Sequence, residues 1–252
     1  MNIFKDYSIK IICISVWIFS STAVLAETST DQLAPLKLVT MDLPPYGWID
    51  DQGNPRGIIY EMTEEIGKRS GLTYTHKIRP FSRMLLELKH GKVDLLSSQA
   101  HDRALKAGDK LAIQFHIDVI AGTKKGSGIE TIEDFKDKNI IYHNAAYYSQ
   151  LDGLPKDISY VKGYRQTLKM LYQRPSLHGG VFSEPAYYYW MKDLGLTLDD
   201  FGNVVMIETD KPQWIFVRKD FPDELRKKLK QIVEDIYQEG MYESLLKKYG
   251  KS

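Results

Sequence analysis

The chain has 252 residues, which is enough for one large domain or for two lobes of ordinary size. Its 34 Lys and Arg residues nearly balance its 33 Asp and Glu residues, so charge gives no reason to expect nucleic acid or an anionic membrane surface as a partner. The composition is ordinary except for 16 tyrosines, many of them between positions 142 and 189. Tyrosine combines a large apolar ring with a polar tip, which suits the lining of a cleft.

The N-terminus has the organisation of an export signal. Lys5 and Lys10 form a basic region, residues 11–18 form an apolar core, and small or aliphatic residues lead up to Ala26. This order predicts a signal peptide over residues 1–26, cleaved after Ala26, and a mature protein in the periplasm. The apolar run is about 15 residues, which is shorter than the ~20 that a membrane-spanning helix needs. A retained membrane anchor is the alternative interpretation.

Cleavage would leave 226 residues with 32 basic and 32 acidic side chains, and hence no formal net charge. The single cysteine, Cys13, lies within the predicted signal. Disulfide bonds, thiolate catalysis and cysteine metal sites are therefore excluded for the mature protein. The six histidines show no ligand-type spacing such as H-x-x-x-H, and we expect neither a metal nor another cofactor.

The first part of the mature chain alternates between strand and helix patterns. A strand ends at the Pro-Pro pair 44–45, turn residues fill positions 50–55, and a helix with apolar residues at helical spacing stops near Gly71. The predicted elements are strands at 36–42, 72–78 and 93–96, with helices over about 57–71 and 84–90. This alternation is typical of parallel sheets covered by helices.

The pattern restarts after a polar stretch at residues 122–128. Strands are predicted at 139–142, 179–182 and 214–217, and helices near 147–151 and over 164–172 and 186–194. An amphipathic helix follows, ending near Gly240, and a shorter helix covers 241–249. The apolar positions of the amphipathic helix are Leu225, Leu229, Ile232, Val233 and Ile236. The organisation is thus two similar α/β blocks and a C-terminal helical segment.

Several motifs occur in a characteristic order. Residues 41–71 read as a strand, Pro-Pro-Tyr, Asp-x-Gly-x-Pro-x-Gly and a helix, and residues 88–94 read L-x-x-G-x-x-D. Near the C-terminus come Phe-Val-Arg-Lys-Asp at 216–220, Gly-Met-Tyr at 240–242 and Lys-Lys-Tyr-Gly at 247–250. Together these motifs resemble the bacterial extracellular solute-binding proteins of the amino-acid type, family 3, which are receptors of ABC importers. The resemblance extends from about Leu36 to Gly250.

The resemblance implies an α/β fold of the type II periplasmic-binding-protein kind, with two lobes, two crossings between them and a ligand cleft in between. One lobe would comprise residues 27–122 plus 213–252, and the other residues 123–212. Ligand would stabilise the closed form through a hinge motion. The implied function is that of a monomeric periplasmic receptor, which binds a small polar solute, an amino acid or related zwitterion, and delivers it to an ABC permease in the inner membrane.

Loops after the predicted strands are expected to hold the ligand, because ligands of open α/β sheets bind beyond the carboxyl ends of strands. The first such loop contains Asp42, Tyr46 and Trp48, whose aromatic rings either stack on a ligand or pack the Pro-rich loop. The resemblance implies that Ser97, Ser98 and an arginine hold a ligand carboxylate. Arg103 occupies the arginine's place, after a loop about two residues shorter than the family pattern. A guanidinium suits a carboxylate, but a solvated surface arginine is the alternative.

The second block supplies two further predicted ligand contacts. Asn144 follows the strand at 139–142, where the family has Gly-Thr or Gly-Ser and this chain has neither. Glu184 follows the strand at 179–182, where the family often has an aspartate that receives the ligand's ammonium group. The alternative for Glu184 is a helix N-terminal carboxylate favoured by the helix dipole. Because the Gly-Thr pair of the family is absent from this chain, an aromatic, cationic or other small metabolite stays open as the ligand.

Two functions other than transport are alternatives for this sequence. A few relatives of this fold are dehydratases or hydrolases, but no nucleophile elbow, phosphate loop or nucleotide fingerprint occurs. Glu184 and His143 would be an imaginable acid–base pair, although nothing in the sequence brings them together. A receptor that docks on a signalling protein would have the same sequence features. We therefore expect a binding protein and not an enzyme.

Overall fold

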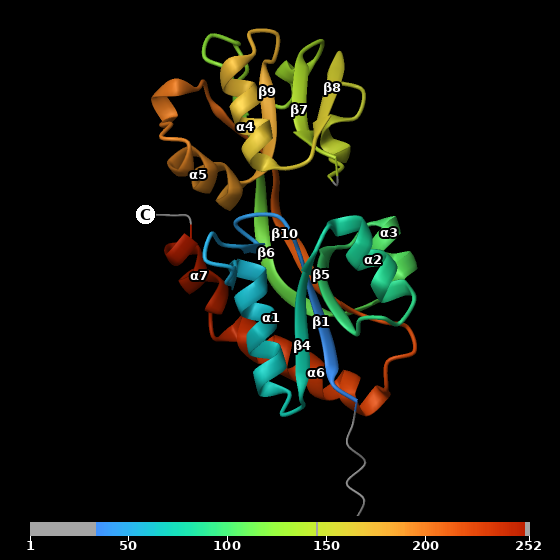
Figure 1. The fold of residues 1–252 in the computed structure, drawn as a ribbon. Helices are drawn as coiled ribbons and strands as arrows, with labels where there is room; N and C mark the ends of the chain where they lie inside the picture. Colours follow the sequence, from blue (N-terminus) through green and yellow to red (C-terminus); the bar gives the residue numbers. More distant parts are fainter. Residues whose placement is uncertain (1–33, 145, 250–252) are drawn as a thin grey trace, which may run out of the picture. The chain divides into compact units, whose positions relative to one another are not determined.

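The computed structural model describes residues 34–144 and 146–249. The predicted signal peptide, its cleavage point after Ala26 and Cys13 lie outside the described residues. Within the described part, an eight-stranded mixed sheet runs in the order β4-β1-β5-β10-β6-β9-β7-β8 (Figure 1). Its strands are β1 Leu36–Met41, β4 Tyr74–Arg79, β5 Leu95–Gln99, β6 Asp109–Thr123, β7 Asn139–His143, β8 Asp157–Val161, β9 Gly179–Ser183 and β10 Val204–Val217.

The sheet has two outer halves joined by a central pair of strands. In the first half β1 is parallel to β4 and β5, and in the second half β7 is parallel to β8 and β9. The central strands β6 and β10 are antiparallel to each other, β10 is antiparallel to β5, and β6 is antiparallel to β9. The parallel pairing predicted for the two α/β blocks is found in the halves, whereas the antiparallel pairing of the central strands was not predicted.

Strands β6 and β10 are the two crossings that the type II fold requires. Strand β6 leads from the first half into the second, and β10 returns beside it (Figure 1). No strand was predicted at 109–123, and only the last four residues of β10 were. Neither strand shows a clean two-residue alternation of buried and exposed side chains, because each strand contacts different elements along its length. Without this alternation, the sequence has no periodic pattern that would predict a strand.

Helices cover the sheet at the positions that sequence spacing indicated, except for the short helix Asp102–Ala107, which was not predicted. Helix α1 packs on β1, α4 packs on β7 and β9, and α6 packs on β6. The predicted helix near 147–151 is only a 3-10 turn, Ser149–Leu151. The helices are α1 Ile58–Arg69, α2 Phe81–Lys89, α3 Asp102–Ala107, α4 Tyr164–Gln173, α5 Glu184–Asp193, α6 Asp223–Gln238 and α7 Met241–Tyr249.

The loop after β1 is fixed by the start of α1. The backbone N–H groups of Ile58 and Tyr60 donate to the carbonyl oxygens of Pro45 and Tyr46, over 2.9 and 3.1 Å. Gly57 precedes the helix with a φ of 129°, and a Cβ atom there would overlap the Tyr46 carbonyl oxygen. Only glycine satisfies both demands, and the result is a firmly held Tyr46.

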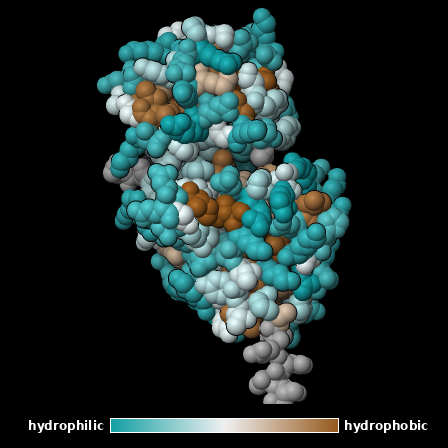
Figure 2. Space-filling model, in the orientation of Figure 1, coloured by the Kyte–Doolittle hydropathy of each residue, from teal (hydrophilic) through white to brown (hydrophobic). Residues whose placement is uncertain are grey.

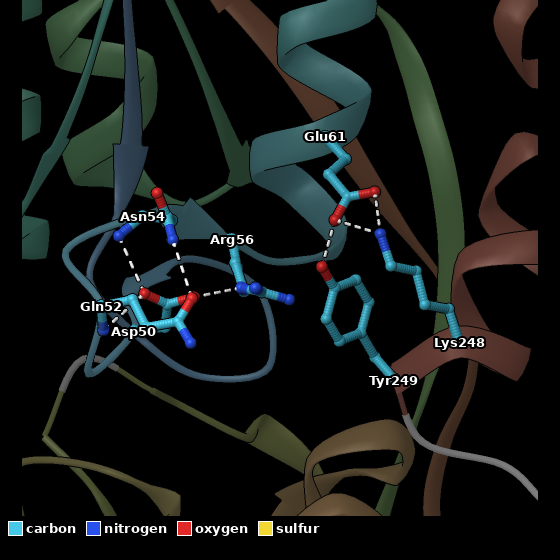
Figure 3. Close-up of polar contacts among 7 residues, drawn as sticks. All are labelled: Asp50, Gln52, Asn54, Arg56, Glu61, Lys248 and Tyr249. Carbon is cyan, nitrogen blue, oxygen red and sulfur yellow. Dashed lines mark hydrogen bonds and ion pairs between the residues drawn. The ribbon is translucent and has the colours of Figure 1, made fainter.

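A short hairpin extends this loop. Strands β2 Trp48–Ile49 and β3 Pro55–Arg56 pair in antiparallel fashion. The Asp50 carboxylate accepts hydrogen bonds from the backbone N–H groups of Gln52 and Asn54, over 3.0 and 2.8 Å, and from the Arg56 side chain (Figure 3). These bonds close the turn that the sequence predicted at residues 50–55.

The central strands are interrupted near the middle of β10. The register shifts between Glu208 and Lys211, where Asp210 has a φ of 54°. The backbone N–H of Asp210 donates to a carboxylate oxygen of Asp118 on β6, over 2.8 Å. A bulge held by a side chain in this way bends the strand locally, so the irregularity lies on the connection between the two halves.

We expect the Asp210 position to tolerate glycine and to reject a β-branched residue. Asp210→Gly should leave the free energy of unfolding within about 1 kcal/mol of the parent protein, because glycine adopts positive φ without strain. Asp210→Val should lower it by about 1–3 kcal/mol. Urea denaturation followed by circular dichroism measures both values. Equal stability of the two variants would contradict the strained backbone at this position.

Candidate ligand-binding site

A cavity lies where strand ends from both halves of the sheet meet. It is reached by Tyr46 from the loop after β1, by Ser97 and Ser98 at the end of β5, by His143 at the end of β7 and by Ser183 at the end of β9. The carboxyl ends of parallel strands form the usual binding edge of such sheets. The volume of the cavity is about 70 Å³.

Two hydrogen bonds join the loop after β1 to the second half across this region. The Tyr46 hydroxyl donates to Ser183 Oγ over 2.6 Å, and the indole Nε1 of Trp190 on α5 donates to the Pro44 carbonyl oxygen over 3.2 Å. Tyr46 is only 4% exposed, and burial raises its pKa well above the ordinary value. Its hydroxyl therefore keeps its proton and serves as a donor.

A buried polar network forms one wall of the cavity. The Ser97 hydroxyl donates to Gln114 Oε1 on β6 over 2.6 Å, and Gln213 Nε2 on β10 donates to Ser97 Oγ over 2.9 Å. The neighbouring Ser98 hydroxyl donates to the Gln99 carbonyl oxygen over 3.0 Å. The network consists of hydroxyl and amide groups, so this wall is polar without being charged, and Gln114 Nε2 is buried there without a hydrogen-bond partner among the described residues.

Two neutral imidazoles also face the cavity. His143 is 6% exposed and its ring lies edge-on to Tyr164, with centroids 4.7 Å apart. Burial lowers the pKa of His143 to about 4. The pKa of His101 is also lowered, by burial first and then by the charge of Arg103. Both rings are uncharged at neutral pH, because burial disfavours the charged form of a base.

The tautomer of His101 follows from its helix contact. Its Nδ1 accepts a hydrogen bond from the backbone N–H of Ala104 over 3.4 Å, at the start of α3, so we assign the proton to Nε2. Nε2 is buried and has no hydrogen-bond partner among the described residues. His101 is one of the residues that line the cavity, so its wall contains a buried donor without a partner among the described residues.

Three residues predicted from sequence, Tyr46, Ser97 and Ser98, line this cavity together. Arg103 and Asn144 line an adjoining pocket, which also contains Asp42 and Lys162 and shares Met41, Leu43, Phe81 and His143 with the cavity. The Arg103 side chain is exposed, with its guanidinium carbon 5.6 Å from the centre of the Phe81 ring.

Trp48 lies in an aromatic cluster and is not among the described residues that line the cavity. Its ring centre is 5.8 Å from that of Tyr189 on α5 and 5.4 Å from that of Tyr249 on α7. Figure 3 shows how Tyr249 is held: its hydroxyl and the Lys248 ammonium group both donate to the Glu61 carboxylate of α1. This geometry favours a packing role for Trp48.

Glu184 is the first residue of α5 and is likewise absent from the described lining of the cavity. Its charge acts on Tyr242 of α7, whose pKa is raised by burial first and by Glu184 next. Tyr242 in turn stacks on the cavity residue Phe115, with centroids 4.2 Å apart. The structure thus places Glu184 near α7 and does not bring it into one pocket with Arg103.

Sequence reasoning missed the lining residues that come from the central strands. Phe115 and Ile117 belong to β6, and Gln213 belongs to β10. No strand was predicted at the first two positions, and β10 was predicted to begin only at Trp214. Tyr148 and Tyr164, also missed, line the second half. The dense tyrosines between positions 142 and 189 were their only signal.

The described residues give no sign of a metal site or a membrane span. Nowhere in residues 34–144 and 146–249 do three or more His, Cys, Asp or Glu side chains converge as metal ligands would. Over the same ranges, no helix has both the length and the apolar character needed to cross a bilayer.

The fold is the two-lobed α/β fold of type II periplasmic binding proteins. Residues 37–252 match the family model described as bacterial extracellular solute-binding proteins, family 3. The chain belongs to this family, as its motifs predicted.

Known proteins similar to this chain include both binding proteins and a sensor domain. A probable amino-acid-binding protein of Bacillus subtilis (strain 168), YxeM, is 26% identical over 212 residues, which cover 79% of this chain and 77% of that protein. An ancestral arginine-binding protein bound to arginine has a TM-score of 0.70 at 20% identity, covering 86% and 99% of the two chains. A histidine kinase sensor domain has a TM-score of 0.72 at 20% identity, covering 87% and 97%. These structural likenesses show the fold.

The buried His143 should make stability depend on pH. Unfolded histidine binds a proton near pH 6.5, whereas folded His143 does so only near pH 4. The folded state therefore binds fewer protons in this window, and the free energy of unfolding should fall by about 3 kcal/mol from this group as the pH drops from 7 to 4. Urea denaturation across this range measures the fall.

His143→Gln should remove that part of the pH dependence. At pH 7 the His143 ring of the parent protein is neutral, so the difference in stability between parent and variant at this pH measures any loss of packing. A variant that keeps the full slope between pH 7 and pH 4 would contradict the assignment to His143.

Proposed function

We propose that the mature protein is a periplasmic receptor that binds an amino acid or a related zwitterion in the cleft between its lobes and delivers it to an ABC permease in the inner membrane. The observation that carries this proposal is the cavity built from strand ends of both halves and bridged by the Tyr46–Ser183 hydrogen bond. Family membership and the similarity to a probable amino-acid-binding protein support it.

The proposed lobes are residues 27–122 plus 213–252 and residues 123–212, with the central strands as hinge. A cavity of about 70 Å³ is small beside the roughly 300–1,000 Å³ of ordinary ligand pockets. Ligand entry would therefore need the lobes to part, and the bulge at Asp210 on β10 is a suitable place for the backbone to bend. Export by the signal at residues 1–26 belongs to the same proposal.

The charged groups suggest how a zwitterion would be oriented. Arg103 remains the proposed partner of the carboxylate, with Asn144 and Lys162 in the same pocket. Glu184 is the ammonium acceptor that the family resemblance implies. Asp42 is a second candidate, because it shares the pocket of Arg103 and Glu184 does not. The Arg103 guanidinium would pair with the ligand's carboxylate, and an acidic side chain of the protein would pair with the ligand's ammonium group.

We propose binding without catalysis. Thr40 Oγ1 lies 2.8 Å from His76 Nε2, and His76 Nδ1 lies 2.7 Å from Glu64 Oε1, which resembles a nucleophile, a base and an acid in line. Thr40 is 0% exposed near the end of β1, so a substrate has no access to it. His143, with its pKa near 4, is a weak base at neutral pH.

The protein is proposed to act as a monomer. On the face shown in Figure 2, apolar side chains form small, separate patches within a mostly hydrophilic surface. The exposed large apolar residues come from many elements, including Leu86 of α2, Tyr160 of β8 and Leu198 of a 3-10 turn. Scattered apolar residues of this kind are normal for monomers and do not form a large contiguous apolar patch for association with another protein.

A thermal-shift screen of the refolded mature chain against amino acids tests the function. A ligand at about 1,000 times its dissociation constant adds about 4 kcal/mol, which corresponds to roughly 8–16 °C in Tm for a chain of this size. Arg103→Ala should weaken the hit by about 10-fold or more, since it removes a charge-assisted contact. Arg83→Ala, an exposed arginine of α2 outside both pockets, is the matched control.

The ammonium acceptor is identified by comparing Asp42→Asn with Glu184→Gln in the same assay. The variant that loses affinity marks the acceptor, and loss in both would assign both. A folded protein that responds to no amino acid would argue against the proposed function. Binding that ignores Arg103→Ala would retain the receptor and remove the proposed carboxylate partner.

The Tyr46–Ser183 hydrogen bond should contribute to closure. Tyr46→Phe removes a buried hydrogen bond worth about 0.5–1.5 kcal/mol, so ligand affinity should fall by roughly 2- to 10-fold. Small-angle scattering should show a larger radius of gyration for the variant at limiting ligand. Tyr74→Phe, which removes a hydroxyl bonded to Glu64 away from the cavity, is the control. Equal affinities in both variants would show that this bond does not hold the lobes together.

A further inference from the structure

The cavity between the strand ends is lined by uncharged side chains. Among the described residues that line it there is no Asp, Glu, Lys or Arg. Aromatic rings are contributed by Tyr46, Phe81, Phe115, Tyr148 and Tyr164, and polar groups come from serine, glutamine and histidine.

The titratable groups of this lining are also neutral near pH 7. Burial raises the pKa of Tyr46, Tyr148 and Tyr164, so their hydroxyls stay protonated. Burial lowers the pKa of His101 and His143, so their rings stay unprotonated. The cavity therefore has no fixed charge with which to balance a charge on a ligand.

Charges lie in the adjoining pocket instead. Asp42, Arg103 and Lys162 line that pocket, which joins the cavity through shared residues such as Phe81 and His143. Lys211 acts electrostatically on His101 but is paired with Glu208 at 2.5 Å. The site thus has a charged outer part and an uncharged inner part.

This division determines what each part can bind. Burying an unpaired ion in an uncharged pocket is costly, whereas a buried hydrogen-bonding group is accommodated once it finds a partner. The inner part offers such partners, among them the buried His101 Nε2–H and the side chain of Gln99 at the end of β5. The five aromatic rings add apolar surface for the rest of a side chain.

We infer, on the basis of the proposed function, that the charged head of the ligand binds in the outer pocket and that an uncharged side chain enters the inner cavity. The receptor accordingly selects amino acids with uncharged polar or aromatic side chains. It discriminates against aspartate, glutamate, lysine and arginine, whose side chains would bring an unpaired charge into the cavity.

Matched ligand pairs that differ mainly in charge test this inference. Isothermal titration calorimetry with the refolded mature protein compares glutamine with glutamate, asparagine with aspartate, citrulline with arginine, and norleucine with lysine. Phenylalanine and tyrosine complete the series. In every pair that binds, we expect the uncharged member to bind tighter by about 100-fold or more.

A variant that introduces a charge into the cavity sharpens the test. Gln99→Glu keeps the length of the side chain and adds a carboxylate, so it should raise the affinity for arginine relative to citrulline by about 10-fold or more. Gln166→Glu makes the same change on the exposed surface of α4 and should leave the ratio unchanged. Circular dichroism and Tm establish that both variants are folded.

The outcomes separate the inference from the proposed function. Preference for the uncharged members, with the ratio shifted only by Gln99→Glu, supports both. Tight binding of a charged member by the parent protein would overturn the inference and leave the amino-acid receptor intact. No binding of any member of the series by the folded protein would overturn the proposed function and, with it, the inference.

Discussion

The antiparallel pairing of β6 with β10 is the constraint on which the site depends. The two strands carry the chain from one half of the sheet to the other and back, and they pair from Asp109 and Val217 to Gly122 and Val204. Each half is parallel within itself, so the carboxyl ends of its strands lie at one edge. Because the central pair joins the halves, the two edges meet, and serine, tyrosine and histidine side chains from distant parts of the chain line one cavity.

Burial then determines the electrostatic character of what the strands bring together. Burial raises the pKa of Tyr46 and lowers the pKa of His143, so Tyr46 keeps its proton and His143 stays unprotonated. Opposite shifts of an acid and a base thus have one cause, and both leave the group neutral. The ionic side chains Asp42, Arg103 and Lys162 lie in the neighbouring pocket, where access to water lowers the cost of their charge.

Sequence patterns predicted the outer parts of the fold better than its centre. Helices α1 and α6 and strands β1, β5 and β9 follow from apolar spacing and turn residues, and Tyr46, Ser97 and Ser98 line the cavity because residues after strand ends meet there. The central strands were for the most part not predicted because neither has one face that is buried along its whole length. Trp48 and Glu184 show a different limit, because the surroundings of their side chains are supplied by parts of the chain distant in sequence. Trp48 contacts Tyr189 of α5 and Tyr249 of α7, and Glu184 acts on Tyr242 of α7.

The order in which the chain supplies the strands also determines when the sheet can be completed. Strand β5 finds its partner β10 only after the whole second half has been made, since Val217 pairs with Leu95. The first half therefore has an unpaired edge until the last segment of the chain is available. Contacts so distant in sequence form slowly, because the intervening loop must close first. A polypeptide with this topology therefore completes its sheet, and with it the cavity, only after nearly the whole chain has been synthesised.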